Sequence, residues 1–158
     1  MKRTDKFQAA LDFATLKHKG QYRIGGLPYI THPCAVAAML KAKGYDEEYQ
    51  IAGLFHDLLE DTDATEQEIE VLGGEQVLET VKLLTKQDGY VMAEYVAAIK
   101  NHPMAAVVKA MDRLHNLQSA VVTDKDFKQR YIQESRRWYL DFSPEILKAV
   151  ETLEESLL

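Results

Sequence analysis

The residues best suited to chemistry are two histidines and two aspartates carried by three separate segments. His32 lies in YITHP, His56 and Asp57 are adjacent in GLFHDLLEDTD, and Asp112 lies in KAMDRLHN. Two imidazoles and two carboxylates suit one divalent cation, and an octahedral ion so held keeps positions open for a water and a phosphate oxygen. The pattern therefore predicts a metal site for phosphohydrolysis.

Two further acids follow the His-Asp pair. A helix is expected from about Asp46 to Glu60, and at about 100° per residue its faces separate. The polar arc carries His56, Asp57, Glu60 and Asp61, and the opposite arc carries Ile51, Leu54, Phe55, Leu58 and Leu59. A His-Asp pair alone is more often a surface pair or a helix terminus. Four ionisable groups with no Lys or Arg nearby in sequence would repel one another, and this favours a bound cation.

The third segment, AVVKAMDRLHNL, repeats this division into faces. Lys109, Asp112 and Asn116 share one face, opposite Val107, Ala110, Leu114 and Leu117. Asp112 is therefore expected to reach the metal, while Lys109 and Asn116 reach toward a bound ligand. Arg113 projects about a quarter-turn away, where a salt bridge to a neighbouring helix is at least as well favoured as substrate contact.

A glycine-containing loop, QYRIGGLPY, precedes His32. It lacks the GxxxxGK[ST] spacing of a phosphate-cradling loop. We expect it to hold Arg23 and Tyr29 over the pocket, because a planar guanidinium can stack on a purine while donating to oxygen atoms. An exposed loop arginine without a role is the alternative.

Taken in order, HKGQYRIGGLPYITHP, GLFHDLLEDT, LLTK and VVKAMDRLHNL resemble the hydrolase domain of the RelA/SpoT family, most closely its single-domain small alarmone hydrolases. The resemblance covers roughly residues 5 to 120. It implies an all-α fold, the HD-domain helical bundle with a metal site between helices. It also implies a bound manganese ion (Mn²⁺) and removal of the 3′ pyrophosphate from ppGpp or pppGpp.

The resemblance implies roles for individual residues as well. The metal ligands would be His32, His56, Asp57 and Asp112. Glu60 and Asp61 would be the catalytic acidic pair. Arg23 would pack on the guanine base, and Asn116 would bind near the ribose or its 3′ phosphate.

Three positions depart from the family pattern. Ile24 and Gln118 stand where many members carry Lys and Arg, and Met111 stands where many carry Ala. The loss of positive charge leaves substrate preference open. A 2′-phosphatase acting on NADPH, a nucleoside monophosphate phosphatase of the same fold, and a non-catalytic nucleotide-binding module are the alternatives.

Length and charge restrict the class of protein. The chain has 158 residues without a Pro/Gly/Ser-rich linker, which predicts one phosphohydrolase domain over residues 1–158. A net charge of −6 disfavours nonspecific nucleic-acid binding. An anionic small-molecule nucleotide then needs local positive charge, which we expect from the metal, Arg23, Lys109 and residues such as Lys19. The sequence gives no indication of the oligomeric state.

The location of the protein is inferred from its first segment and its cysteine content. No apolar run near the start is long enough for a signal peptide or a membrane span, and Cys34 is the single cysteine. Both features predict a cytoplasmic protein without membrane contact. Cys34 follows Pro33 at the start of an apolar helix and is interpreted as a small core residue.

Helices are expected almost throughout, and no segment alternates for long enough to predict a strand. Caps, glycines and prolines predict helices over about 4–19, 33–44, 46–60, 65–72, 74–84, 89–101, 103–122, 125–140 and 144–157. The remaining histidines, His18, His102 and His115, are interpreted as structural or solvated, and for His115 the alternative is support of a metal ligand. The aromatic residues of the 125–140 helix are expected mainly in the core, with nucleotide contact as the alternative.

Overall fold

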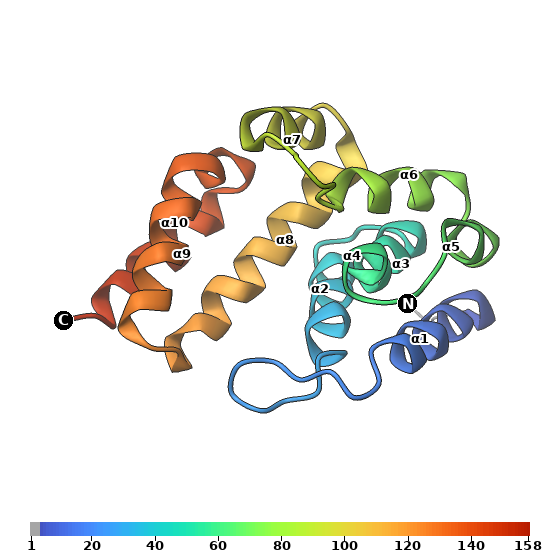
Figure 1. The fold of residues 1–158 in the computed structure, drawn as a ribbon, viewed down its shortest axis with the longest axis horizontal. Helices are drawn as coiled ribbons and strands as arrows, with labels where there is room; N and C mark the ends of the chain where they lie inside the picture. The colour runs from blue at the N-terminus through green and yellow to red at the C-terminus, as the bar shows by residue number, and fades with distance from the viewer. Residues whose placement is uncertain (1–3) are drawn as a thin grey trace.

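The computed structural model describes residues 4–158 as an assembly of helices (Figure 1). In chain order these are α1 (Asp5–Lys17), α2 (Thr31–Ala42), α3 (Glu47–Phe55), α4 (Leu58–Asp61), α5 (Glu66–Gly73), α6 (Glu75–Leu84), α7 (Met92–Lys100), α8 (Pro103–Ser119), the 3₁₀ turn η1 (Ala120–Val122), α9 (Lys125–Trp138), the 3₁₀ turn η2 (Leu140–Phe142) and α10 (Pro144–Glu155). Within this part of the chain, the β-type pairing is a single bridge between Tyr22 and Pro28. The predicted all-α fold is confirmed.

Short polar side chains define where several helices begin. Thr4, Asp46, Thr65 and Asp124 each accept a hydrogen bond from a backbone N–H in the first turn of the helix that follows. These bonds satisfy donors that have no partner inside the helix. The helix starts read from caps in the sequence therefore agree closely with the structure.

Helix α8 crosses the middle of the molecule, with α9 and α10 along one side and α1 to α6 on the other (Figure 1). It contacts α2, α3, α6, α7 and α10. Helix α3 is buried on all sides from Gln50 to Phe55. The segments that carry the predicted metal ligands are thus held by the best-packed helices of the fold.

The predicted continuous helix from Asp46 to Glu60 is wrong. Helix α3 ends at Phe55, and α4 begins only at Leu58. Asp57 adopts φ −103° and ψ 0°, outside helical geometry. The His56 side chain bonds to the Gly53 carbonyl oxygen through Nδ1 at 2.6 Å, so a local side-chain bond occupies a carbonyl of the last helical turn. The His-Asp pair therefore sits in a turn.

Other helices are shorter than the sequence pattern predicts. The α8 helix ends at Ser119 and continues as η1, α9 ends at Trp138, and α7 starts at Met92.

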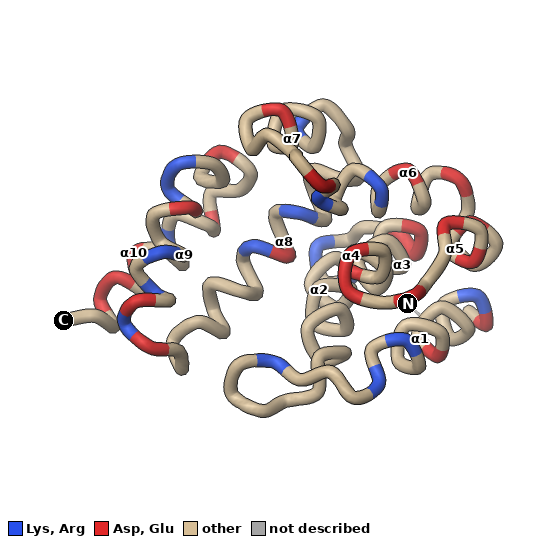
Figure 2. Tube along the Cα trace, viewed as in Figure 1, with Lys and Arg blue, Asp and Glu red and all other residues tan. Residues whose placement is uncertain are grey.

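In residues 4–158, no helix is both long enough and apolar enough to cross a bilayer. Acidic positions gather on α4, α5 and α6 (Figure 2).

Candidate metal centre and adjoining pocket

Three segments that are distant in sequence meet at the predicted metal ligands. His32 comes from α2, His56 and Asp57 from the turn between α3 and α4, and Asp112 from α8. Ligand atoms of His32, His56 and Asp57 all lie within 4.8 Å of one another. Asp112 Oδ1 lies 2.8 Å from His32 Nε2 and 3.2 Å from His56 Nε2. The structure thus brings the four residues together.

A glycine sets the approach of two of these segments. A Cβ atom added to Gly53 on α3 would lie 3.0 Å from Leu40 Cδ1 and 3.2 Å from Val36 Cγ1, both on α2. The absence of that atom lets the two helices pack closely. As a result, the ring centroids of His32 and His56 are 5.1 Å apart.

The ring nitrogen of His56 that carries the hydrogen determines whether these residues fit a cation. The Gly53 carbonyl oxygen can only accept, so Nδ1 of His56 carries the hydrogen. The Nε2 atom then faces Asp57 Oδ2 at 3.0 Å and Asp112 Oδ1 at 3.2 Å. A bare nitrogen lone pair and carboxylate oxygens repel unless a proton or a cation lies between them. Imidazole nitrogen with carboxylate oxygen suits a divalent metal ion, and the residues fit it.

The two aspartates keep their charge despite being buried. Burial alone would raise the pKa of Asp57, but the neighbouring His56 imidazole lowers it to about 2. Burial likewise opposes ionisation of Asp112, yet Lys109 and His56 hold its pKa well below the usual range. Both carboxylates are therefore ionised at neutral pH and available to a cation.

Lys109 does not face the open pocket. Its Nζ donates to Asp112 Oδ2 at 3.1 Å and lies over the Tyr139 ring at 5.4 Å from the centroid. Burial opposes its charge, but Asp112 raises its pKa. The positive charge of Lys109 is thus paired with Asp112, a predicted metal ligand. This ion pair replaces the contact with substrate that was expected for Lys109. Lys19, the other basic residue expected near the site, lines a separate surface hollow.

The acidic pair on α4 divides into two environments. Glu60 Oε1 accepts a hydrogen bond from the backbone N–H of Lys86 at 2.8 Å. Asp61 receives a bond on its backbone carbonyl from Gln21 Nε2 at 2.8 Å, which leaves its carboxylate outside that contact. Partial burial, together with the charges of Asp57 and Glu60, raises the pKa of Asp61 to about 6. Asp61 is thus the acid whose protonation changes near neutral pH.

The loop before α2 brings its two predicted residues to the centre. The Tyr29 hydroxyl donates to Asp57 Oδ2. The guanidinium of Arg23 donates to Asn116 Oδ1 at 2.9 Å and contacts His115 Nδ1 at 3.2 Å. Asn116 in turn donates to Asp112 Oδ1 at 3.1 Å. A continuous set of polar contacts therefore joins the loop to the predicted metal ligands.

His115 contacts a predicted metal ligand. Its Nδ1 lies 2.8 Å from His32 Nδ1, and the two rings meet edge to edge, with centroids 5.0 Å apart and planes within 22°. This contact fits the alternative given for His115, support of a metal ligand, better than a solvated position. Residues three apart on a helix are neighbours, and His115 follows Asp112 by three. Burial, with His32 and Arg23 nearby, lowers the pKa of His115 to about 4.

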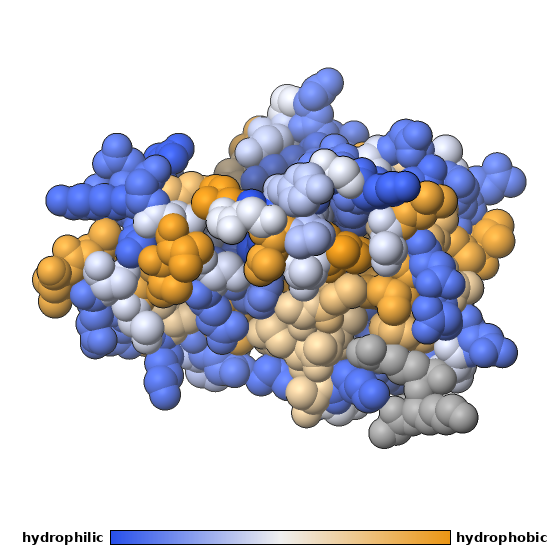
Figure 3. All heavy atoms as spheres, turned by 90° about the horizontal axis from the view of Figure 1, so that it is seen from below, coloured by the Kyte–Doolittle hydropathy of each residue, from blue (hydrophilic) through white to orange (hydrophobic). Residues whose placement is uncertain are grey.

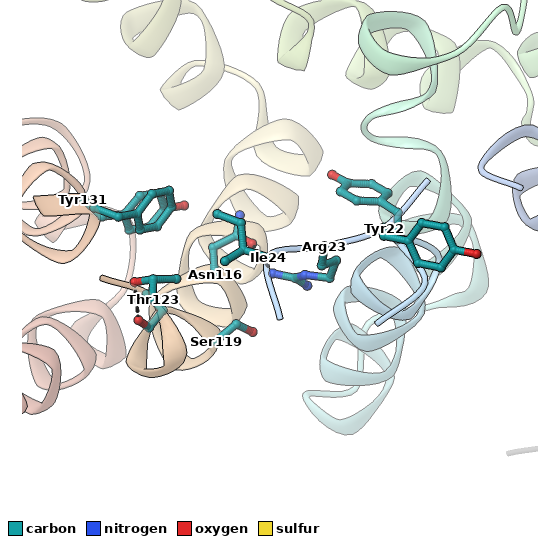
Figure 4. Close-up of a pocket in the computed structure, with 10 residues that line it drawn as sticks. Tyr22, Arg23, Ile24, Asn116, Ser119, Thr123 and Tyr131 are labelled. Carbon is teal, nitrogen blue, oxygen red and sulfur yellow. Dashed lines mark hydrogen bonds between the residues drawn. The ribbon is translucent and has the colours of Figure 1, made fainter. Parts of the chain in front are cut away.

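A pocket of about 280 Å³ opens beside this centre (Figure 4). It is lined by Tyr22, Arg23, Ile24, Tyr29, Asn116, Ser119, Ala120, Thr123, Phe127 and Tyr131. Arg23 is the one lining residue with a formal charge. The rings of Phe127 and Tyr131, on α9, are parallel within 10° with centroids 5.6 Å apart. An aromatic wall that the sequence analysis assigned mainly to the core therefore faces an arginine across the pocket.

Two of the three positions that depart from the family pattern, Ile24 and Gln118, lie close to this pocket, whereas Met111 is buried in the core. Ile24 lines the pocket, and both Ile24 and Gln118 line a second hollow that shares Arg23. Ile24, Leu27 and Val122 are exposed apolar residues. Seen from below, the surface shows separate apolar patches among hydrophilic ones (Figure 3). The environment of Arg23 is thus more apolar than the family pattern implies.

Arg113 confirms the expected bridge to a neighbouring helix. Its Nη2 lies 2.5 Å from Glu134 Oε1 on α9. The guanidinium carbon is also 4.2 Å from the ring centroids of both Tyr131 and Tyr139. The buried cation fastens α9, and with it the aromatic wall of the pocket, to α8.

The other histidines and the cysteine have structural surroundings, as expected. His18 is buried, with its Nδ1 2.9 Å from Gln21 Oε1. His102 caps α8 by accepting from the Ala105 N–H at 3.2 Å. Cys34 is half-buried and packs against the hydrophobic core.

Comparison with known families places this geometry in context. The family model described as HD domain matches residues 10–143. The chain belongs to the HD domain family. Among its relatives is a protein of Aquifex aeolicus named guanosine-3′,5′-bis(diphosphate) 3′-pyrophosphohydrolase, 34% identical over 143 residues that make up 85% of this chain and 20% of the relative. The bifunctional (p)ppGpp synthase/hydrolase SpoT of Escherichia coli K12 is 34% identical over 77% of this HD-domain chain and 19% of its own length.

These relatives confirm the resemblance to RelA/SpoT hydrolase domains. The chain spans about a fifth of their length. A solved structure described as a metazoan ortholog of SpoT that hydrolyses ppGpp aligns with a TM-score of 0.75 and 23% identity, over 99% of this chain and 94% of that one. A Listeria monocytogenes structure aligns with a TM-score of 0.60 at 24% identity, over 84% and 99% of the two chains. Both alignments show that this HD-domain chain shares their fold.

Proposed function

We propose that this protein is a manganese-dependent phosphohydrolase that converts ppGpp to GDP and pyrophosphate and treats pppGpp in the same way. The observation that carries the proposal is the meeting of His32, His56, Asp57 and Asp112 beside a pocket lined by Arg23. The names of the relatives supply the substrate class.

In the proposed reaction, a water oxygen bonds to the phosphorus attached to the ribose 3′ oxygen. The bond between that phosphorus and the 3′ oxygen breaks, and the 3′ oxygen takes a proton. When bound, the metal ion would supply a water of lowered pKa and positive charge beside the phosphate. His32, His56, Asp57 and Asp112 would hold it.

The acids of α4 have distinct roles in this proposal. Asp61 accepts the proton of the attacking water, because its raised pKa of about 6 suits proton transfer near neutral pH. Glu60, fixed by the Lys86 N–H, adds negative charge beside Asp61 and helps to orient the water. The Tyr29 hydroxyl holds the Asp57 carboxylate in place.

The pocket binds the nucleoside part of the substrate. The Arg23 guanidinium and the aromatic wall of Phe127 and Tyr131 offer stacking surfaces for a planar base. Asn116 lies between Arg23 and Asp112, and therefore between the base and the metal ligands, where a ribose or its 3′ phosphate would lie.

The test is a hydrolysis panel with Mn²⁺ in which ppGpp, pppGpp, NADPH and GMP are supplied separately and the products identified. We expect GDP and pyrophosphate from ppGpp. NADPH belongs in the panel because a pocket with one charged lining residue makes few demands on the phosphates of its ligand. His56→Ala should be inactive, and Gln76→Ala, at an exposed position of α6, is the control. Phosphate released from GMP while ppGpp stays intact would refute the proposal.

A further inference from the structure

His115 contacts two parts of the site, the arginine of the pocket and a proposed metal ligand. On one side, Arg23 Nη1 lies 3.2 Å from His115 Nδ1. On the other, His32 Nδ1 lies 2.8 Å from the same atom. One ring nitrogen of His115 thus faces both the arginine of the pocket and a proposed metal ligand.

The chemistry of Arg23 decides where the protons lie. A guanidinium stays protonated and has only donors, so His115 Nδ1 must offer its lone pair and carry no hydrogen. His32 Nδ1 faces that acceptor and must therefore carry a hydrogen. This leaves Nε2 of His32 as the nitrogen with a free lone pair, on the side of Asp112 Oδ1 at 2.8 Å.

We propose that His115 is a positioning residue that fixes His32 as the Nδ1–H tautomer and aims its Nε2 at the metal. His56 obtains the same tautomer from the Gly53 carbonyl. His32 lies in the first turn of α2, and within residues 4–158 its ring nitrogens contact side chains only, so a side chain of α8 supplies the acceptor. Partners of this kind orient a ligating imidazole and raise its basicity.

The inference rests on the metal site of the proposed function and is independent of the substrate. Two substitutions separate its parts. His115→Phe keeps a flat ring beside His32 but removes the acceptor, whereas His115→Asn removes the ring and keeps an acceptor oxygen near the position of Nδ1. The control is Gln76→Ala, at an exposed position of α6.

The experiment measures Mn²⁺ affinity without nucleotide, by electron paramagnetic resonance of the free ion, for proteins whose folding is checked by thermal unfolding. We expect His115→Phe to weaken binding by about tenfold or more. His115→Asn should recover most of the loss, and the control should match wild type. Equal affinity of His115→Phe and wild type would overturn the proposal, as would an equal loss in both His115 variants. A wild-type chain that binds no Mn²⁺ would instead refute the proposed function.

A measurement on the unmutated protein covers the case in which a variant does not fold. In ¹⁵N-labelled wild type loaded with diamagnetic Zn²⁺, long-range ¹H–¹⁵N spectra report which imidazole nitrogens carry hydrogen. The proposal requires hydrogen on Nδ1 of His32 and none on Nδ1 of His115. Hydrogen on Nδ1 of His115 would overturn it.

Discussion

The fall in activity on the acidic side of the pH profile, the acidic limb, should result from protonation of Asp61. Partial burial, then the charges of Asp57 and Glu60, raise the pKa of its carboxyl to about 6. As the proposed base, Asp61 works only when deprotonated, so activity should fall as the pH drops through that value. With a pKa of about 6, only about a tenth of the molecules have the charged form at pH 5, and kcat/KM should be lower by about tenfold. A cation at Asp57 would cancel part of the repulsion and so move the midpoint to lower pH.

Two variants test this assignment through the shape of the profile. Asp61→Asn should lose about 10²–10⁴-fold in rate, and its residual activity should lack the limb. Glu60→Gln removes one of the charges that raise the Asp61 pKa, so the limb of its residual activity should move to lower pH. The assay is kcat/KM for ppGpp between pH 4.5 and 8 at saturating Mn²⁺, a range of about two units around the midpoint. An unchanged limb in Asp61→Asn would refute the reasoning.

Two further predictions separate metal binding, chemistry and substrate recognition. His56→Ala should lose bound Mn²⁺ and activity together, whereas Asp61→Asn should keep the metal and lose turnover, as measured by elemental analysis beside kinetics; metal loss in both would contradict the assigned roles. Arg23→Ala should weaken binding of a nonhydrolysable ppGpp analogue by about 1–2 kcal/mol, or roughly tenfold, with metal content unchanged. Equal affinity of this variant and wild type would mean that the base binds elsewhere, for example on the α9 aromatic wall.

The parts of the fold that local chemistry controls could be predicted from the sequence. Caps such as Thr4 and Asp46 satisfy helix donors within a few residues, so periodicity and capping located most helices. The break after Phe55 could not be located in this way. It depends on a His56 side-chain bond to a backbone carbonyl, which competes with helix geometry and leaves the hydrophobic pattern unchanged.

The site was predictable where residue type alone limits the chemistry. Histidine and aspartate in three segments indicated the metal ligands, and the structure brings them together. The pairing of Lys109 with Asp112 follows from their spacing of three on one helix face, whereas the burial that keeps Lys109 from the pocket depends on how α8 packs. The aromatic residues of α9 were expected mainly in the core, because Tyr131 has the spacing of a core residue and lines the pocket only through the way α9 packs. The extent of the domain, residues 1–158, stays a prediction.

The close packing at Gly53 has a consequence for which ions the centre would accept. Because α2 and α3 approach through a missing Cβ, the backbones that carry His32 and His56 are held close together, and the two ring centroids lie 5.1 Å apart. A rigid separation selects among cations by ionic radius, whereas a flexible one would accept whichever ion binds nitrogen most strongly. An alanine there would press against Leu40 and Val36 and widen the gap by a fraction of an ångström. Discrimination between ions of equal charge would therefore depend on Gly53, which does not contact the ion.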